Sequence, residues 1–215
     1  MNNLTIFGLT AGVGSLVLAG SASADFIGMS YETVENGMAG LTTYRIYVDI
    51  DDGELDAVYG DTANALEVNS DSGFYQNPFG GYGTPNAALF VAFPSLEFDS
   101  FVTIGLLNDT GDAMMDIGID WNDFEDNGGN IWTDNGTWFA TPDQPQVLDV
   151  NGQVLIGQFT VADSDHVFGT LNFQGKEADA STNWNALGVD FDTIPAPGAL
   201  ALLGLAGLAA RRRRK

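Results

Sequence analysis

Oxygen-bearing side chains that could hold a divalent cation gather in one acidic stretch. They stand at alternate positions from Asp123 onward, and glycine follows at the sixth position, Gly128. This spacing approximates a calcium-binding loop, in which hard oxygen ligands alternate around a tight turn. The candidate calcium ligands are Asp123, Glu125, Asn127 and Asp134. Glutamate at the third position and aspartate at the twelfth depart from the usual pattern, and a solvated acidic hairpin tip is the alternative.

Catalytic chemistry has few candidates in this sequence. The one histidine, His166, lies beside a serine and two aspartates in the segment 163–166. A catalytic triad needs members that converge from separate segments, so we expect His166 to be a solvated turn residue. The chain has no cysteine, which excludes a thiol nucleophile and a disulfide scaffold. We assign no catalytic residue, and a carboxylate-based hydrolase is the weakest alternative.

Aromatic side chains offer a second kind of binding chemistry. All four tryptophans lie in the second half of the chain, and a glycine-rich segment, 73–85, carries Tyr75, Phe79 and Tyr82. Aromatic faces beside acidic hydrogen-bond acceptors can hold sugars, and long loops are often functional. Tryptophans in a β protein are more often core residues, so the loop aromatics are the expected sugar contacts.

The charge of the chain is strongly and unevenly acidic. Among 215 residues, 29 acids stand against 7 bases, a formal net charge of −22. Residues 25–193 hold all 29 acids and only Arg45 and Lys176 as bases, a net charge of −27. The other five bases end the chain. Nucleic-acid binding is excluded, because neutralising phosphates requires clustered Lys and Arg.

The N-terminal segment is typical of a secretory signal. Residues 6–18 form an apolar run that is too short to span a bilayer, and Ala22 and Ala24 flank a small-residue cleavage motif. This predicts a helical signal peptide over 1–24, with Asp25 as the first mature residue. No Lys or Arg precedes the apolar run, and a buried N-terminal helix is the alternative.

The C-terminal segment, 194–215, combines three features in a fixed order. A proline motif comes first, a wholly apolar or glycine stretch over 198–210 follows, and basic residues end the chain. The apolar stretch predicts a helical membrane segment, and the bases keep its end cytoplasmic. The motif residues are Ile194, Pro195, Ala196, Pro197 and Gly198. The orienting bases are Arg211, Arg212, Arg213, Arg214 and Lys215.

This tail resembles the PEP-CTERM sorting signal of exported bacterial proteins, with Ala196 departing from the glutamate of the family motif. The resemblance implies recognition by an exosortase, a membrane cysteine transpeptidase, after export by the general secretion machinery. The precursor would be anchored transiently in the membrane and then released to the cell surface or extracellular matrix, with exopolysaccharide as a further partner. A plain membrane anchor is the alternative.

The segment between the two ends, 25–193, predicts one acidic all-β domain. In residues 44–50, apolar Ile46, Val48 and Ile50 alternate with polar positions. Turn signals separate the runs, and Asn135-Gly136 and Asn151-Gly152 predict tight hairpins. We expect an antiparallel β-sandwich, with jelly-roll and cohesin-like arrangements as finer alternatives. Further strands are predicted at 27–33, 55–59, 88–93, 98–107, 115–121, 147–150, 154–161 and 167–173.

Four sequence segments of this domain carry a second resemblance. LDAVYGD, FPSLEFDSFVTIG, GTWFATPDQ and VLIGQFTV resemble an uncharacterised all-β domain of secreted or surface proteins. The run 55–59 is more weakly similar to cohesin-like sandwiches. Neither resemblance implies functional residues, so the sequence predicts a non-catalytic surface protein or, alternatively, a carbohydrate- or calcium-dependent binding module.

Overall fold

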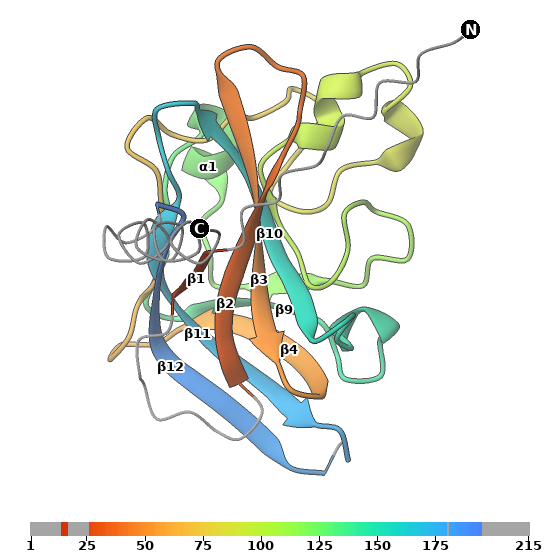
Figure 1. Ribbon diagram of the computed structural model, residues 1–215, viewed down its shortest axis with the longest axis vertical. Coiled ribbons are helices and arrows are strands. Elements are labelled where there is room, and N and C mark those ends of the chain that lie inside the picture. Colours follow the sequence, from red (N-terminus) through yellow and green to blue (C-terminus); the bar gives the residue numbers. More distant parts are fainter. Residues whose placement is uncertain (1–13, 17–25, 180, 195–215) are drawn as a thin grey trace, which may run out of the picture.

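Two antiparallel sheets make up the domain. The computed structural model describes residues 14–16, 26–179 and 181–194. Sheet A has five strands, and β2, β3 and β10 run near the vertical in Figure 1. Its strand order is β1 (Gly14–Leu16), β2 (Phe26–Val34), β3 (Leu41–Ile50), β10 (Gln153–Ala162) and β6 (Phe101–Val102).

Sheet B contains seven strands, but two pairs of them lie end to end. Strand β11 pairs with β4 through 172–177 and with β5 through 168–170, so β4 and β5 share one side of β11. Next to them, β9 pairs with β4 and β8 pairs with β5. The strands are β4 (Gly53–Gly60), β5 (Leu66–Asn69), β7 (Met115–Ile117), β8 (Ile131–Thr133), β9 (Gly136–Phe139), β11 (Phe168–Glu177) and β12 (Asn183–Asp192).

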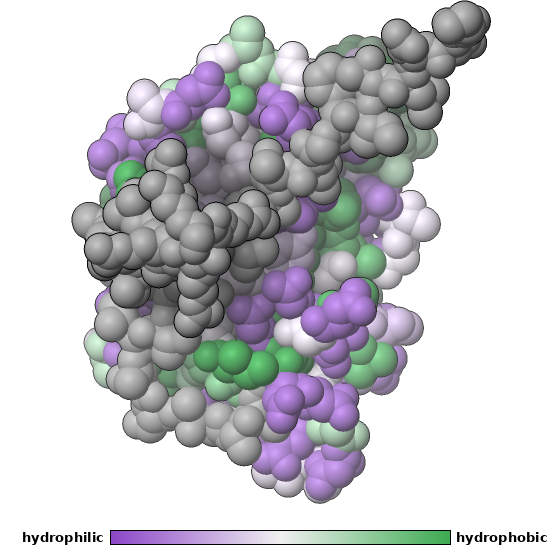
Figure 2. All heavy atoms as spheres, in the orientation of Figure 1, coloured by the Kyte–Doolittle hydropathy of each residue, from purple (hydrophilic) through white to green (hydrophobic). Residues whose placement is uncertain are grey.

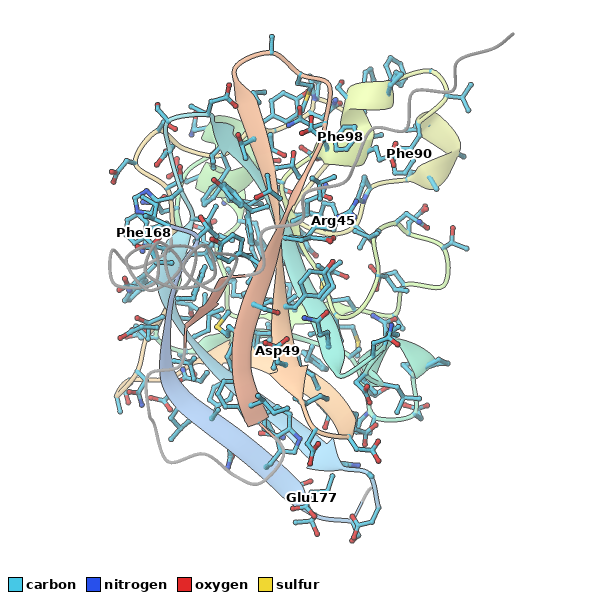
Figure 3. The ribbon with its side chains drawn as sticks, viewed as in Figure 1. Arg45, Asp49, Phe90, Phe98, Phe168 and Glu177 are labelled. Carbon is cyan, nitrogen blue, oxygen red and sulfur yellow. The ribbon has the colours of Figure 1, made fainter. Side chains whose placement is uncertain are left out.

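The core lies between the two sheets, as predicted for an all-β sandwich. Ile46, Val48 and Ile50 of β3 are all buried, which confirms the predicted inward face. Arg45 and Asp49 lie along the outer face of sheet A in Figure 3, where Arg45 binds Glu32 and Gln158. Burial of apolar faces against each other is the main force that holds such layers together.

The visible surface mixes polar and apolar residues. Apart from the grey atoms, Figure 2 shows hydrophilic residues interspersed with smaller hydrophobic areas. This face therefore shows no single large hydrophobic area outside the grey atoms.

Four predicted strands are wrong over most of their length. Residues 88–93 form the end of the 3-10 helix η1 (Ala87–Leu89) and the turn after it, and none of them is buried, so no core face exists to hold a strand. Within the predicted strand 98–107, only β6 (Phe101–Val102) is formed. The 3-10 helix η2 (Pro94–Phe98) takes up its start, and Gly105, with φ +77°, turns the chain after β6. Of the predicted strand 115–121, only Met115–Ile117 is a strand, β7. The predicted strand 147–150 forms no strand of either sheet, because its first residue ends the 3-10 helix η3 (Pro145–Val147) and the rest is irregular. Phe90 and Phe98 mark the irregular excursion in Figure 3.

Neither predicted hairpin forms, although one of the two turns has the predicted local conformation. Asn151 and Gly152 both have positive φ, and the Val150 amide donates to the Gln153 carbonyl at 2.9 Å, but 147–150 is not a strand and β10 pairs with β3 and β6 instead. Asn135-Gly136 joins β8 to β9, but these strands pair with β5 and β4 and not with each other. Asn135 and Gly136 form a bend between two collinear strands, because β5 and β4 together present one continuous edge to β8 and β9.

The predicted helical ends lie almost entirely outside the described residues. Within the predicted signal, Gly14–Leu16 form strand β1, which pairs with Met29–Tyr31 of β2, so these three residues are not helical. No helix in the described ranges is long and apolar enough to cross a membrane.

Candidate functional site

The predicted calcium ligands do not converge. Residues Asn122–Asn127 form helix α1, which Asp120 initiates by accepting from the Asn122 amide and Gly128 ends with φ +67°. Asp123 Oδ1 accepts from Asn127 Nδ2 at 2.9 Å, but Glu125 Oε1 accepts from the Tyr82 amide. Asp134 lies exposed beyond β8.

This corrects the calcium-loop prediction. The ligands of such a loop must wrap around one point, whereas a helix separates Asp123 and Glu125 around its axis. Across the described parts of the chain, no three His, Asp or Glu side chains lie close enough together to hold a metal ion.

His166 lies between two aspartates and forms no triad. Its Nδ1 is 3.6 Å from Asp165 Oδ1 and its Nε2 is 3.8 Å from Asp192 Oδ1, while its ring stacks on Phe168. Both nitrogens thus face carboxylates, and neither faces a hydroxyl nucleophile.

The aromatic residues predicted as sugar contacts serve mostly to build the domain. Tyr82 stacks on Trp121 at 4.6 Å and donates to Asp116, and Trp138 and Trp184 are buried in the core. Tyr75 is half-buried and accepts from Asn77. Phe79 is exposed but stacks on Phe93 at 4.0 Å, and Trp132 is exposed on β8. These side chains do not form one continuous face.

An open hollow on the outer face of sheet B is the best candidate site. It has a volume of about 530 Å³, and five neighbouring strands, β7, β9, β4, β11 and β12, contribute to its lining. Register pairs Ala57 with Phe139, and Tyr59 with Thr137, so these side chains share the outer face. Gln174 and Lys176 of β11 and Asn183 of β12 continue that face. We call this surface the sheet B hollow.

A β-bulge brings Asp56 into the lining of the hollow. Gln174 pairs with Ala57 and Gly175 pairs with Leu55, so Asp56 is the extra residue of β4. Its side chain is nine-tenths buried, and its Oδ1 has no hydrogen-bond partner. Burial and the neighbouring Glu54 raise the pKa of Asp56 to about 6, and Lys176 partly opposes this shift.

The side chains that line the hollow offer contacts for a ligand. Asp56 is the single carboxylate among the described lining residues, whereas glycoside hydrolysis uses two carboxyl groups that flank the bond. Glu54 is nearby but is buried outside the lining. Two aromatic rings, two amides, three hydroxyls and one ammonium group provide contacts for a polar ligand with apolar faces.

Comparison with known proteins adds no relative. No family model, no curated protein and no solved structure matches this chain.

Two buried aspartates should make the domain less stable as pH rises. Burial raises the pKa of Asp99 to about 7 although backbone amides donate to it, and that of Asp56 is about 6. Unfolding returns both to about 3.9, so the folded chain binds more protons between these values. We expect a melting temperature about 5 °C higher at pH 5 than at pH 8. Calorimetry measures it.

The double variant Asp56→Asn/Asp99→Asn separates these groups from general charge repulsion. It removes both titrations and leaves the other acids in place, so its melting temperature should depend less on pH. An unchanged pH dependence would contradict the assignment.

Proposed function

We propose that this chain is an exported, non-catalytic protein of the cell surface or extracellular matrix. In this proposal the general secretion machinery exports it, residues 1–24 are removed, and the tail anchors it transiently in the membrane. An exosortase then cuts near Pro195-Ala196-Pro197. The observation that supports this most is where the folded domain ends.

The last strand is complete immediately before the proline motif. Thr193 Oγ1 accepts from the Val167 amide at 2.9 Å, and the Thr193 amide donates to the Val167 carbonyl at 3.0 Å. The next residue, Ile194, is half exposed. Among the described residues, the buried members of the hydrophobic core lie between Met29 and Phe191, with Phe26 packed against them. Cleavage after Ile194 would therefore leave the sandwich intact.

Removal of the predicted signal would cost little of the fold. Strand β2 begins at Phe26 and keeps its pairing with β3 along its whole length. Of the pairs that involve described residues, only the three between β1 and β2 would be lost. The described domain is thus compatible with processing at both of its ends.

A non-catalytic role fits the chemistry of the described residues. His166 forms no triad, and the sheet B hollow holds one carboxylate. The net charge of −27 over 25–193 would keep a released protein soluble and disfavours binding to polyanions.

Replacing the five terminal bases tests this proposal. With serine at Arg211 to Lys215, the positive charges that hold the end of the tail in the cytoplasm are lost. In cells with an exosortase, we expect uncut precursor to accumulate and released protein to fall at least tenfold. Intact-mass analysis of the membrane and released fractions measures both.

The matched control replaces the four arginines by lysine. It keeps the charge, so orientation should be retained and release should stay within about twofold of wild type. Normal cutting of the serine variant would contradict the proposal.

A further inference from the structure

We propose that the sheet B hollow binds a neutral polysaccharide, a chain of hexose units with free hydroxyl groups. The inference goes beyond the proposed sorting route, because it concerns only residues of the described domain. It rests on two aromatic rings, two unengaged amides and a buried carboxylate oxygen that share one surface.

The aromatic contacts come from two neighbouring strands. Tyr59 of β4 and Phe139 of β9 are half-buried and stand on the diagonal of one antiparallel pair, since Ala57 pairs with Phe139 and Tyr59 with Thr137. Diagonal neighbours lie roughly 7–8 Å apart between Cα atoms. An extended chain can therefore rest the C–H faces of successive units on both rings.

The polar contacts are not used by the protein itself. The side-chain amides of Gln174 and Asn183 make no hydrogen bond to any described residue, although both line the hollow. Because the amide nitrogen donates and the amide oxygen accepts, each side chain can bind a sugar hydroxyl that acts as acceptor or as donor. Lys176 adds a donor beside them.

Asp56 supplies the observation that points most directly to a ligand. Its side chain is only 7% exposed, and its Oδ1 accepts no hydrogen bond. A buried carboxylate oxygen without a donor lowers stability, and such groups call for an explanation. A sugar hydroxyl in the hollow would donate to the carboxyl group of Asp56, which lines that hollow. We therefore assign Asp56 as the acceptor that fixes ligand orientation.

The charge of the domain selects the class of polysaccharide. The hollow contains one cation, Lys176, in a domain with a net charge of −27. A polyuronate or sulfated chain would be repelled, and more strongly at low salt. A neutral chain meets no such barrier.

Binding of defined oligosaccharides to the purified full chain tests the inference. The probes are hexasaccharides of β-linked glucose and of mannose, with an oligouronate of equal length as the charged comparison. A polyoxyethylene detergent avoids the sugar headgroups of glucoside detergents. We expect calorimetry to show binding of at least one neutral probe and at least tenfold weaker binding of the oligouronate.

Variants locate the site. The double variant Tyr59→Ala/Phe139→Ala should weaken binding at least tenfold. The matched control Trp132→Ala removes an exposed ring of the same sheet outside the hollow and should leave affinity within twofold. Melting temperatures confirm that each variant is folded.

Asp56→Asn separates binding from folding. Removing a buried charge should raise the melting temperature at pH 8, while a neutral acceptor should bind the probe about fivefold more weakly, since charged hydrogen bonds are stronger. A purely structural Asp56 would change stability and leave affinity alone.

Three outcomes would overturn the inference: no neutral probe binds the folded chain, Trp132→Ala abolishes binding while the hollow variants bind normally, or only a protein partner engages the hollow. Each outcome leaves the tail proposal standing, because processing is measured independently of glycan binding.

Discussion

Gly175→Ala should destabilise the domain by about 4 kcal/mol, which lowers the melting temperature by about 10 °C. Gly175 lies in β11 between Leu55 of β4 and Trp184 of β12. A methyl group there would overlap the Glu54 carbonyl oxygen and come within 2.6 Å of the Trp184 ring. Both obstacles are fixed in place, one by the backbone and the other by burial.

This glycine lets the largest side chain of β12 reach the core. Trp184 is 1% exposed and lies next to Phe26, which stacks on Phe173 at 5.7 Å. Glycine weakens a strand intrinsically, but here it makes room for an aromatic ring. Adding a side chain therefore forces either β4 or the tryptophan out of position.

Gly83→Ala is the matched control. Its added methyl would meet only the end of the Met114 side chain, at 3.4 Å. We expect its free energy of unfolding to stay within about 0.5 kcal/mol of wild type. Chemical denaturation measures both variants, and equal stability for Gly175→Ala and wild type would contradict the packing described here.

Asp165→Ala should cost about 3 kcal/mol, because it removes the acceptor at the centre of a buried network. Asp165 Oδ2 accepts from Ser70 Oγ at 2.6 Å, Ser72 N at 2.7 Å and Ser72 Oγ at 2.5 Å. Oδ1 accepts from the His166 amide at 2.7 Å. The network joins the β10–β11 connection to the turn after β5.

The pH dependence of this variant provides a second readout. Burial opposes ionisation of Asp165, but the hydrogen bonds from Ser70, Ser72 and His166 outweigh it, so the pKa lies below its usual range. Its contribution is therefore full above about pH 4 and is lost as pH falls further. The stability gap between wild type and Asp165→Ala should close in acid, as thermal unfolding at several pH values can measure.

Asp163→Ala is the control in the same connection. Asp163 is exposed and accepts a single bond from Thr42, so its loss should cost at most about 0.5 kcal/mol. If both variants were equally stable, the network around Asp165 would not hold the two segments together.

The parts of the fold that follow from local pattern could be predicted. Residues 44–50 alternate with period two, and their inward face is buried as expected. Asn151-Gly152 has the conformation that its residue types favour. Asn135-Gly136 does not form a hairpin, since the pairing of β8 with β5 and of β9 with β4 is decided by distant strands. Local turn preference carries no information about those partners.

The candidate site could not be predicted, for the same reason. Asp56 reaches the hollow through a bulge, and its neighbours Phe139, Gln174 and Asn183 come from strands far along the chain. The calcium-loop spacing misled because Phe124 buries one side of the segment and favours a helix. One signal was present: a polar residue at 56 interrupts the apolar run of β4.

The most direct test of the proposed function is the intact mass of the protein released from the surface of the cells that make it. We expect a species that begins at Asp25 and ends within 194–198, without the apolar stretch and the five terminal bases. Recovery of a released species that still ends in Arg211 to Lys215 would contradict processing of the tail.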